Sequence, residues 1–118
     1  MKNLSISLLL LLFTLSCAEN DSYSKRVLNA DTENESWLLH GRTYDESRFS
    51  PLNDINDSNV QDLGLGWSFE TGTNRGHETT PIVVDGIMFI TAPWSVVFAL
   101  DAKTGKEIWS VDPEADKD

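Results

Sequence analysis

Side chains that could do chemistry gather in one short segment, residues 75–81, which has the sequence RGHETTP. An imidazole, His77, stands next to a carboxylate, Glu78, and such groups can bind metals or transfer protons. His77 has no second histidine or cysteine nearby, and His40 is equally isolated, so neither predicts a metal site. We expect both imidazoles to pack in loops. Glu78 is the candidate that remains, and its role depends on the elements that position it.

The elements that must position this segment are strands. Beyond residue 64 the apolar residues alternate with polar ones, which is the period of a half-buried strand, and Trp67 and Phe69 share one face. The expected strands cover residues 65–70, 80–84, 87–91, 96–101 and 107–111. Asp85 and Gly86 predict a two-residue type I′ turn, because glycine accepts a positive φ without steric cost. The last four strands should form an antiparallel meander.

A second pattern, ALDAKTGKEIW, closes this meander. Ala99 is small enough for close sheet packing, Asp101 can accept hydrogen bonds from turn amides, and Thr104 with Gly105 forms the turn. Trp109 is expected to pack flat against a neighbouring sheet. An ordinary hairpin with a buried tryptophan is the competing interpretation. Either way, the pattern specifies architecture rather than chemistry.

One meander has one or two apolar faces and nothing to bury them against, so it is not a stable domain by itself. Sheets of this kind become stable by radial repetition, as in a β-propeller. We therefore predict an all-β fold in which residues 37–118 form an irregular N-terminal arm and the first blade. The arm should contain one short helix near residues 60–63, capped by Asp57 or Ser58. One copy of the repeat is recognised, so we expect the neighbouring blades in a longer chain.

Residues 1–18 predict export. A basic start is followed by a largely apolar run and then by small residues, which is the pattern of a secretory signal peptide. The apolar run is too short for a helix that spans a bilayer. Cys17, the only cysteine, lies in an imperfect lipobox, so two processing routes are open: lipidation of Cys17, or cleavage after Ala18 without lipid. Residues 19–36 are rich in Asp, Glu, Asn and Ser and predict a disordered tether.

The segment RGHETTP and the pattern ALDAKTGKEIW together resemble the start of the quinoprotein alcohol dehydrogenases of the methanol and ethanol dehydrogenase family, which carry pyrroloquinoline quinone (PQQ). Residues 41–52, with a Gly-Arg pair followed by Arg-Phe-Ser-Pro-Leu, are similar to the opening of that family. The resemblance covers residues 37–113. Residues 93–97, PWSVV, resemble the quinohaemoprotein branch, in which a cytochrome c domain with haem c follows the propeller.

The resemblance implies specific roles. Glu78 matches a glutamate at the start of the first blade that hydrogen-bonds PQQ in the central channel; a solvated loop glutamate is the alternative. Arg42 and Arg48 are expected to pair with carboxylates and to fix the arm. An eight-bladed propeller and a Ca²⁺ ion are implied as well. The Ca²⁺ ligands, a pair of adjacent cysteines and the catalytic aspartate of the family lie beyond residue 118.

The implied activity is the periplasmic oxidation of a primary alcohol by a PQQ- and Ca²⁺-dependent dehydrogenase that passes electrons to a cytochrome c. This sequence would supply the first blade and one cofactor contact, and we expect it to be inactive alone. The alternative is a non-enzymatic propeller lipoprotein that scaffolds outer-membrane protein assembly, which needs neither Glu78 nor the opening at residues 41–52. A membrane-bound sugar dehydrogenase is disfavoured, because its relatives place several membrane spans ahead of the propeller.

The charge balance narrows the choice of partners. A formal net charge of −10 argues against nucleic acid as a partner. Two interpretations of the acidic surface stay open: a solvated surface that keeps the protein soluble, and a docking face for a basic electron acceptor such as a cytochrome.

Overall fold

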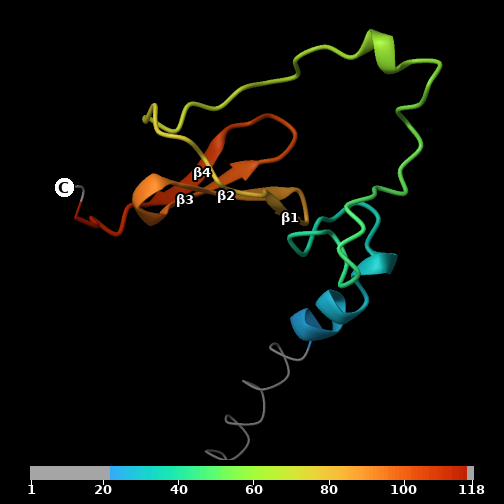
Figure 1. Ribbon diagram of the computed structural model, residues 1–118, viewed down its shortest axis with the longest axis horizontal. Helices are drawn as coiled ribbons and strands as arrows, with labels where there is room; N and C mark the ends of the chain where they lie inside the picture. Colours follow the sequence, from blue (N-terminus) through green and yellow to red (C-terminus); the bar gives the residue numbers. More distant parts are fainter. Residues whose placement is uncertain (1–21, 117–118) are drawn as a thin grey trace, which may run out of the picture.

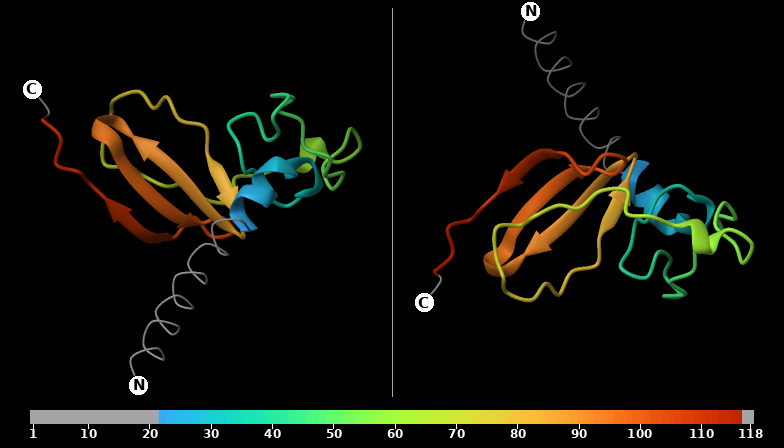
Figure 2. Two further views of the ribbon diagram at one scale, coloured as in Figure 1. Left: turned by 90° about the horizontal axis from the view of Figure 1, so that it is seen from below. Right: turned by 90° about the horizontal axis from the view of Figure 1, so that it is seen from above.

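The computed structural model describes residues 22–116, in which an N-terminal arm and a long connection lead into a four-stranded sheet (Figure 1). The predicted signal peptide, residues 1–18, and the predicted lipid site, Cys17, lie outside the described residues, as do residues 117–118. Two further views show that the arm lies beside one end of the sheet and that the connection, which bows outward in Figure 1, returns across the sheet (Figure 2).

The sheet is the predicted antiparallel meander, with strand order β1-β2-β3-β4. Its strands are β1 (Ile82–Val84), β2 (Ile87–Ala92), β3 (Val96–Asp101) and β4 (Glu107–Val111). Residues 85 and 86 join β1 to β2 with φ angles of 51° and 79°, so the type I′ turn is confirmed. Strand β1 begins two residues later than expected, because Pro81 has no N–H to donate to a ladder.

The strand expected at residues 65–70 is wrong. The segment is not a strand in the structure, because its backbone has no partner strand among the described residues. Its alternation is nevertheless meaningful, since Trp67 and Phe69 both pack against the core of the sheet. The Phe69 ring meets the Phe98 ring edge-on, with centroids 5.1 Å apart. The period-2 pattern therefore predicted which side chains face the sheet but not the hydrogen bonding.

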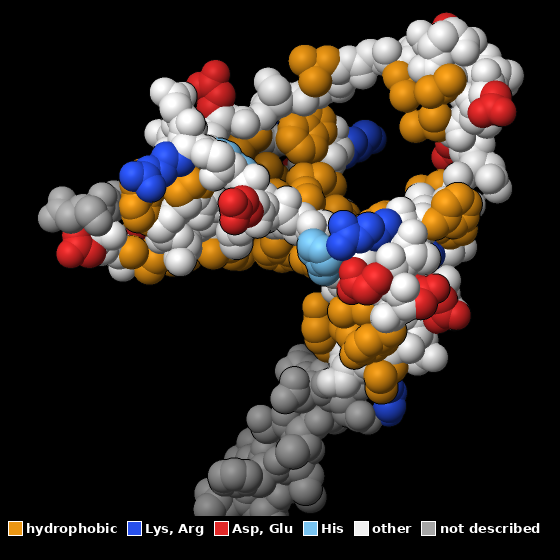
Figure 3. Space-filling model, viewed as in Figure 1, with side chains coloured by type: hydrophobic (Ala, Val, Ile, Leu, Met, Phe, Trp, Pro, Cys, Tyr) orange, Lys and Arg blue, Asp and Glu red, His pale blue; other side chains and the backbone are white. Residues whose placement is uncertain are grey.

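The two faces of the sheet differ in how well they are covered. One face holds the buried cluster of Ala92, Phe98 and Leu100, which the segment around Trp67 covers. On the other face Ala99 is fully buried between its cross-strand partners Phe89 and Trp109. Strand β4 forms an edge and is exposed along its whole length. Figure 3 shows hydrophobic side chains at the surface along the sheet and the connection.

The short helix of the connection is η2 (Val60–Asp62), a 3-10 turn at the expected place. Its expected cap is wrong: neither Asp57 nor Ser58 is the N-cap residue, which is Asn59. The Asn59 side chain turns backward, and its Oδ1 accepts a hydrogen bond from the Asn56 backbone N–H at 2.8 Å. Competition from this local bond explains the difference.

The disordered tether expected at residues 19–36 is corrected for its described part. Residues 22–28 are helical and η1 (Ala30–Thr32) follows. The Arg26 guanidinium bonds both Glu33 oxygens and both Asp85 oxygens at 2.8–2.9 Å, which ties the helix to the β1–β2 turn. Trp37 adds two backbone hydrogen bonds with Val83 in β1. Composition alone did not predict that these residues are ordered. They are held by the ion pairs of Arg26 and by the backbone pairing of Trp37, rather than by burial of apolar side chains.

Candidate functional site

The strands of the sheet run between two ends (Figure 1), and the residues at these two ends differ in chemistry. The turn end comprises residues 85–86 and 102–106, where β1–β2 and β3–β4 reverse direction, and the Ala102 N–H donates to the Gly86 carbonyl across it. The open end comprises residues 75–80 and 92–95, at the opposite ends of the same strands. Sequence-predicted site residues are found at both ends.

At the turn end, Asp101 organises the β3–β4 turn. Its Oδ1 accepts hydrogen bonds from the Lys103 N–H (3.1 Å), the Thr104 N–H (2.7 Å) and the Thr104 hydroxyl (2.7 Å). The Thr104 hydroxyl and amide are the main reason that the pKa of Asp101 lies below its ordinary value. Gly105 takes a φ of +70°, which glycine adopts without penalty. The turn is therefore built as the sequence predicts.

Trp67 completes the turn end, and sequence reasoning missed it. Its indole lies directly over Gly105, where an added Cβ would come within 2.4 Å of the ring. The Trp67 Nε1–H donates to the Ala102 carbonyl at 3.2 Å. A signal was present: the letters WSFE at Trp67 and WSVD at Trp109 are two copies of one pattern. They lie roughly 40 residues apart, which is the spacing of propeller blades.

Trp109 lies in the last strand of the sheet, β4, where it pairs with Ala99. It is 43% exposed, so the competing interpretation of a hairpin with a buried tryptophan does not hold. Its ring approaches Phe89 with centroids 6.0 Å apart. A bulge between the β3 positions Ala99 and Leu100 shifts the register at the start of β4. Docking of Trp109 on a following sheet stays a prediction.

At the open end, Glu78 is exposed just before β1. It lines an open depression together with Arg75, Gly76 and Pro93. The segment is held against β2 by its neighbour Thr79, whose hydroxyl accepts a hydrogen bond from the Thr91 N–H at 3.3 Å. A carboxylate held in this way can accept hydrogen bonds from a ligand that enters the depression.

A cation lies on the same rim. The Arg75 guanidinium stacks over the Trp94 ring, with its central carbon 4.8 Å from the ring centroid. Trp94 belongs to η3 (Pro93–Ser95), in which Trp94 and Ser95 have φ angles of 62° and 63°. Left-handed backbone is unfavourable for residues with a Cβ and is concentrated at functional sites. Sequence reasoning did not identify this pair, because the stacking depends on those φ angles.

Both histidines lie in loops, where their side chains are exposed and each contacts one neighbouring polar group. His77 Nε2 lies 2.8 Å from the Thr71 hydroxyl, and His40 Nε2 lies 2.8 Å from an Arg48 nitrogen. Arg48 also pairs with the Glu46 carboxylate at 3.6 Å, as predicted. The carboxylate pairing expected for Arg42 is wrong. Among the described residues, this buried side chain donates instead to the Asp31 carbonyl and to the Asn34 side-chain oxygen, because Asp31 meets the guanidinium with its backbone oxygen rather than with its carboxylate.

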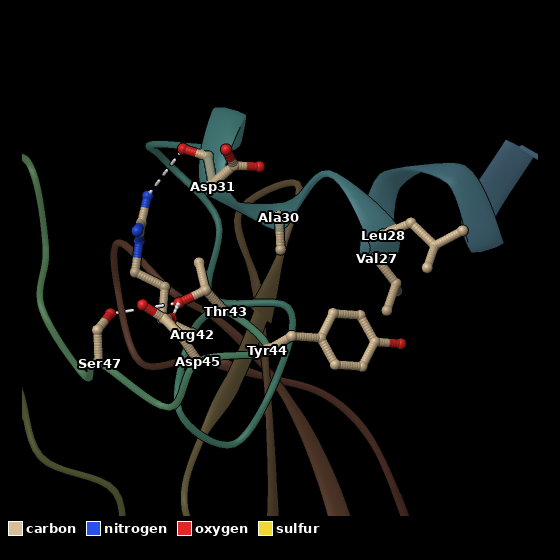
Figure 4. Close-up of a pocket in the computed structure, with 9 residues that line it drawn as sticks. All are labelled: Val27, Leu28, Ala30, Asp31, Arg42, Thr43, Tyr44, Asp45 and Ser47. Atoms are coloured by element: carbon tan, nitrogen blue, oxygen red, sulfur yellow. Dashed lines mark hydrogen bonds between the residues drawn. The ribbon is translucent and has the colours of Figure 1, made fainter.

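A second hollow lies within the arm, between residues 27–31 and 42–47 (Figure 4). Its polar groups bond one another. Thr43 donates to Asp45 and meets the Ser47 hydroxyl at 3.2 Å, while Arg42 reaches the Asp31 carbonyl. The main cause of the lowered pKa of Asp45 is its bond from Thr43. The bond from Arg42 to the Asp31 carbonyl joins η1 to the loop of residues 42–47.

No metal centre is formed among residues 22–116, because no three histidine, cysteine or acidic side chains come together there. In the same residues, no helix has the length and apolar character needed to cross a membrane.

Residues 37–118 match the family described as "PQQ: Glucose/ethanol/alcohol dehydrogenase, beta-propeller domain". The chain is 54% identical over 92 residues to the quinohemoprotein alcohol dehydrogenase ADH-IIG of Pseudomonas putida, a match that covers 78% of this chain and 13% of the relative. It is 50% identical over 82 residues to the 1-butanol dehydrogenase (cytochrome c) of Thauera butanivorans, over 70% of this chain and 12% of that protein. The chain thus spans about an eighth of the length of these relatives.

Solved structures agree with this assignment. The structure of ADH-IIG from Pseudomonas putida HK5 superposes with a TM-score of 0.73 at 54% identity, over 76% of this chain and 13% of that one. The quinohemoprotein alcohol dehydrogenase of Comamonas testosteroni superposes with a TM-score of 0.64 at 52% identity, over 67% of this chain and 12% of that one. The meander, its docked turn and the segment around Glu78 all fall within the matched residues, and the chain belongs to the PQQ-type alcohol dehydrogenase family as part of its β-propeller domain.

Proposed function

We propose that this chain is the N-terminal part of a longer, exported dehydrogenase that oxidises primary alcohols with PQQ and Ca²⁺ and passes the electrons to a cytochrome c. The chain contributes the first blade and one cofactor contact, Glu78. The observation that carries the proposal is the 54% identity over 78% of this chain, in a stretch that includes the open end of the sheet. By itself the chain has no activity in this proposal, since the catalytic aspartate lies elsewhere.

The residues at the open end fit part of the cofactor. PQQ is a planar tricarboxylate with a pyrrole N–H, so it offers a donor to the Glu78 carboxylate and acceptors to cations. The depression beside Glu78 is open, and a Cβ placed on Gly76 would meet nothing within 4 Å. When bound, PQQ supplies the two-electron acceptor for alcohol oxidation. Glu78 binds and orients it by accepting a hydrogen bond.

The residues do not fit a calcium site. Because residues 22–116 bring no three candidate ligands together, the proposed Ca²⁺ ion is held by other residues of the longer protein. The residues that bind Ca²⁺ and the residue of this chain that contacts PQQ would then come from different parts of the longer protein. A haem group and the cytochrome acceptor are supported by two of the relatives, which are named as a quinohemoprotein and as a "dehydrogenase (cytochrome c)".

The test uses the full-length apoprotein with added Ca²⁺. We expect added PQQ to produce alcohol-dependent dye reduction, and Glu78→Gln to bind PQQ about tenfold more weakly in equilibrium dialysis, through loss of a charge-assisted hydrogen bond. Glu107→Gln is the matched control, because it removes the same charge at the turn end. If PQQ produced no alcohol-dependent dye reduction with the wild-type protein, the proposal that it is a PQQ-dependent dehydrogenase would be refuted.

Export and lipidation form a separate part of the proposal. A protein lipidated at Cys17 incorporates labelled palmitate and fractionates with membranes, and Cys17→Ser abolishes both. An unlabelled protein in the periplasmic fraction would support cleavage after Ala18 instead. The non-enzymatic scaffold is not favoured, since the matching proteins are named as dehydrogenases.

A further inference from the structure

Arg75 differs from the other arginines in its partners. Arg26 bonds Glu33 and Asp85, Arg42 bonds backbone and amide oxygens, and Arg48 pairs with Glu46. In the described part of the chain, the Arg75 guanidinium has no oxygen partner and contacts the Trp94 ring by its face. Its N–H groups are therefore available to the oxygens of a ligand of opposite charge.

Trp94 holds this guanidinium in a defined orientation. The left-handed backbone at Trp94 and Ser95 turns the indole beneath Arg75, and the start of β3 at Val96 follows at once. Stacking covers one face of a guanidinium and leaves its N–H edges open, which is the geometry that binds a carboxylate through two parallel hydrogen bonds. The strained turn therefore serves as a platform that orients the cation before a ligand arrives.

Arg75 and Glu78 share the depression at the open end but form no ion pair with each other in the described structure. Their charges therefore remain available to a ligand that carries a carboxylate and an N–H donor on one rigid frame. PQQ has both. A tricarboxylate beside Glu78 would be repelled unless a nearby cation compensated, and Arg75 is the cation on the same rim.

We propose that Arg75, oriented by Trp94, binds one carboxylate of the quinone cofactor beside Glu78. Arg75 is then a cofactor-binding residue, and Trp94 is a positioning residue that acts through it. The inference rests on the proposed function, because it takes PQQ as the ligand of this depression. It adds a charge-recognition role that Glu78 alone does not provide.

The first experiment measures the Kd of PQQ for the full-length apoprotein by equilibrium dialysis with Ca²⁺ present. We expect Arg75→Gln to raise the Kd about tenfold or more, through loss of a charge-assisted bond, and Arg75→Lys to recover part of the loss. Lys103→Gln, which removes the same charge at the turn end, should leave the Kd unchanged. The trimethyl ester of PQQ, which lacks the carboxylate charges, should bind wild type and Arg75→Gln equally.

The second experiment tests the platform. Trp94→Leu should raise the Kd of PQQ about threefold, which is the size of an exposed cation–π contact, and Trp94→Phe should restore most of it. In an Arg75→Gln background, Trp94→Leu should add nothing, since its effect passes through the missing cation. A purely structural role of Trp94 would give a loss that persists in that background and with the ester.

The outcomes separate the two proposals. If wild type does not bind PQQ, the proposed function fails. If wild type binds PQQ and Glu78→Gln weakens it, but Arg75→Gln does not, the Arg75 inference alone is overturned. An equal loss for PQQ and for its ester would also overturn it. Circular dichroism melts verify folding, and if Arg75→Gln is unfolded, the comparison of Arg75→Lys with the ester decides.

Discussion

The turn end and the open end of the same sheet satisfy their polar groups in opposite ways. At the turn end, Asp101 accepts its bonds from the turn itself, Trp67 covers Gly105, and Arg26 neutralises Asp85. At the open end, Arg75 and Glu78 line one depression without pairing, next to left-handed residues that are not glycine. One end is internally complete and the other is not. The difference supports our proposal that the turn end is architecture and that the open end is the site.

The largest effect on stability is expected at the turn end, where substitutions of two glycines can be compared. Gly105→Ala places a Cβ within 2.4 Å of the Trp67 ring at a φ of +70°, so we expect a loss of about 3 kcal/mol in the free energy of unfolding. Gly86→Ala meets open space at a φ of +79° and should cost about 1 kcal/mol. Urea unfolding of the full-length protein measures both. Equal losses would mean that Trp67 does not pack on Gly105.

A smaller effect isolates the hydrogen bond of the indole. Trp67→Phe keeps a ring over Gly105 but removes the Nε1–H that donates to the Ala102 carbonyl, so we expect a loss of about 1 kcal/mol. Because Trp67 and Gly105 are in contact, the cost of Gly105→Ala should shrink when Trp67 is replaced by alanine. Strict additivity in that double mutant would contradict the docking.

At the open end, a substitution by glycine should stabilise the protein, whereas the substitutions at the turn end destabilise it. Ser95 has a φ of +63° and an exposed side chain, so Ser95→Gly removes a steric penalty and should raise the free energy of unfolding by about 0.5 kcal/mol. The same urea titration measures it, with Ser68→Gly as a control in extended backbone, where glycine should destabilise. A loss of stability from Ser95→Gly would show that the left-handed turn is not strained.

The smallest expected effect on global stability concerns the hydrogen bonds by which Arg26 attaches the arm to the sheet. Hydrogen bonds from Arg26 hold the pKa values of Asp85 and Glu33 below their ordinary range. Their contribution is therefore complete above the ordinary pKa and is lost as the pH falls through the lowered values, below about pH 4. Hydrogen-exchange protection of residues 22–36 should fall in that window, and Arg26→Gln should remove the protection at neutral pH. Protection unchanged by both would contradict the ionic attachment.

The part that sequence could predict is the part governed by period and turn chemistry. Alternation predicted β1 to β4, and the pairs Asp85-Gly86 and Thr104-Gly105 predicted the turns that join them. Strand pairing of residues 65–70 was wrong, because a strand needs a partner that the period does not reveal. The ordered arm was missed because Arg26 and Asp85 lie far apart in sequence.

At the site, the sequence predicted Glu78 by resemblance and left Arg75 without a role. The stacking on Trp94 depends on two left-handed residues, neither of which is a glycine or an asparagine that would have indicated that backbone. The role of Trp67 could have been predicted, because WSFE and WSVD repeat one pattern. Its contacts, Gly105 and the Ala102 carbonyl, lie in a turn that forms only when the sheet folds.

Trp67 and Trp109 together determine how such sheets can assemble. The turn of this sheet contacts an indole from the chain that precedes it, and a second indole, 43% exposed, lies on the last strand of the sheet. If Trp109 packs on the turn of the next sheet as Trp67 packs on Gly105, which we predict, such sheets join head to tail and not about a two-fold axis. Head-to-tail contacts end in a closed ring when the rotation per unit divides a full circle, and in an open filament when it does not. In that predicted arrangement, the packing of each indole on its glycine would help to set the angle between successive sheets, and with it the number of sheets that closes the ring.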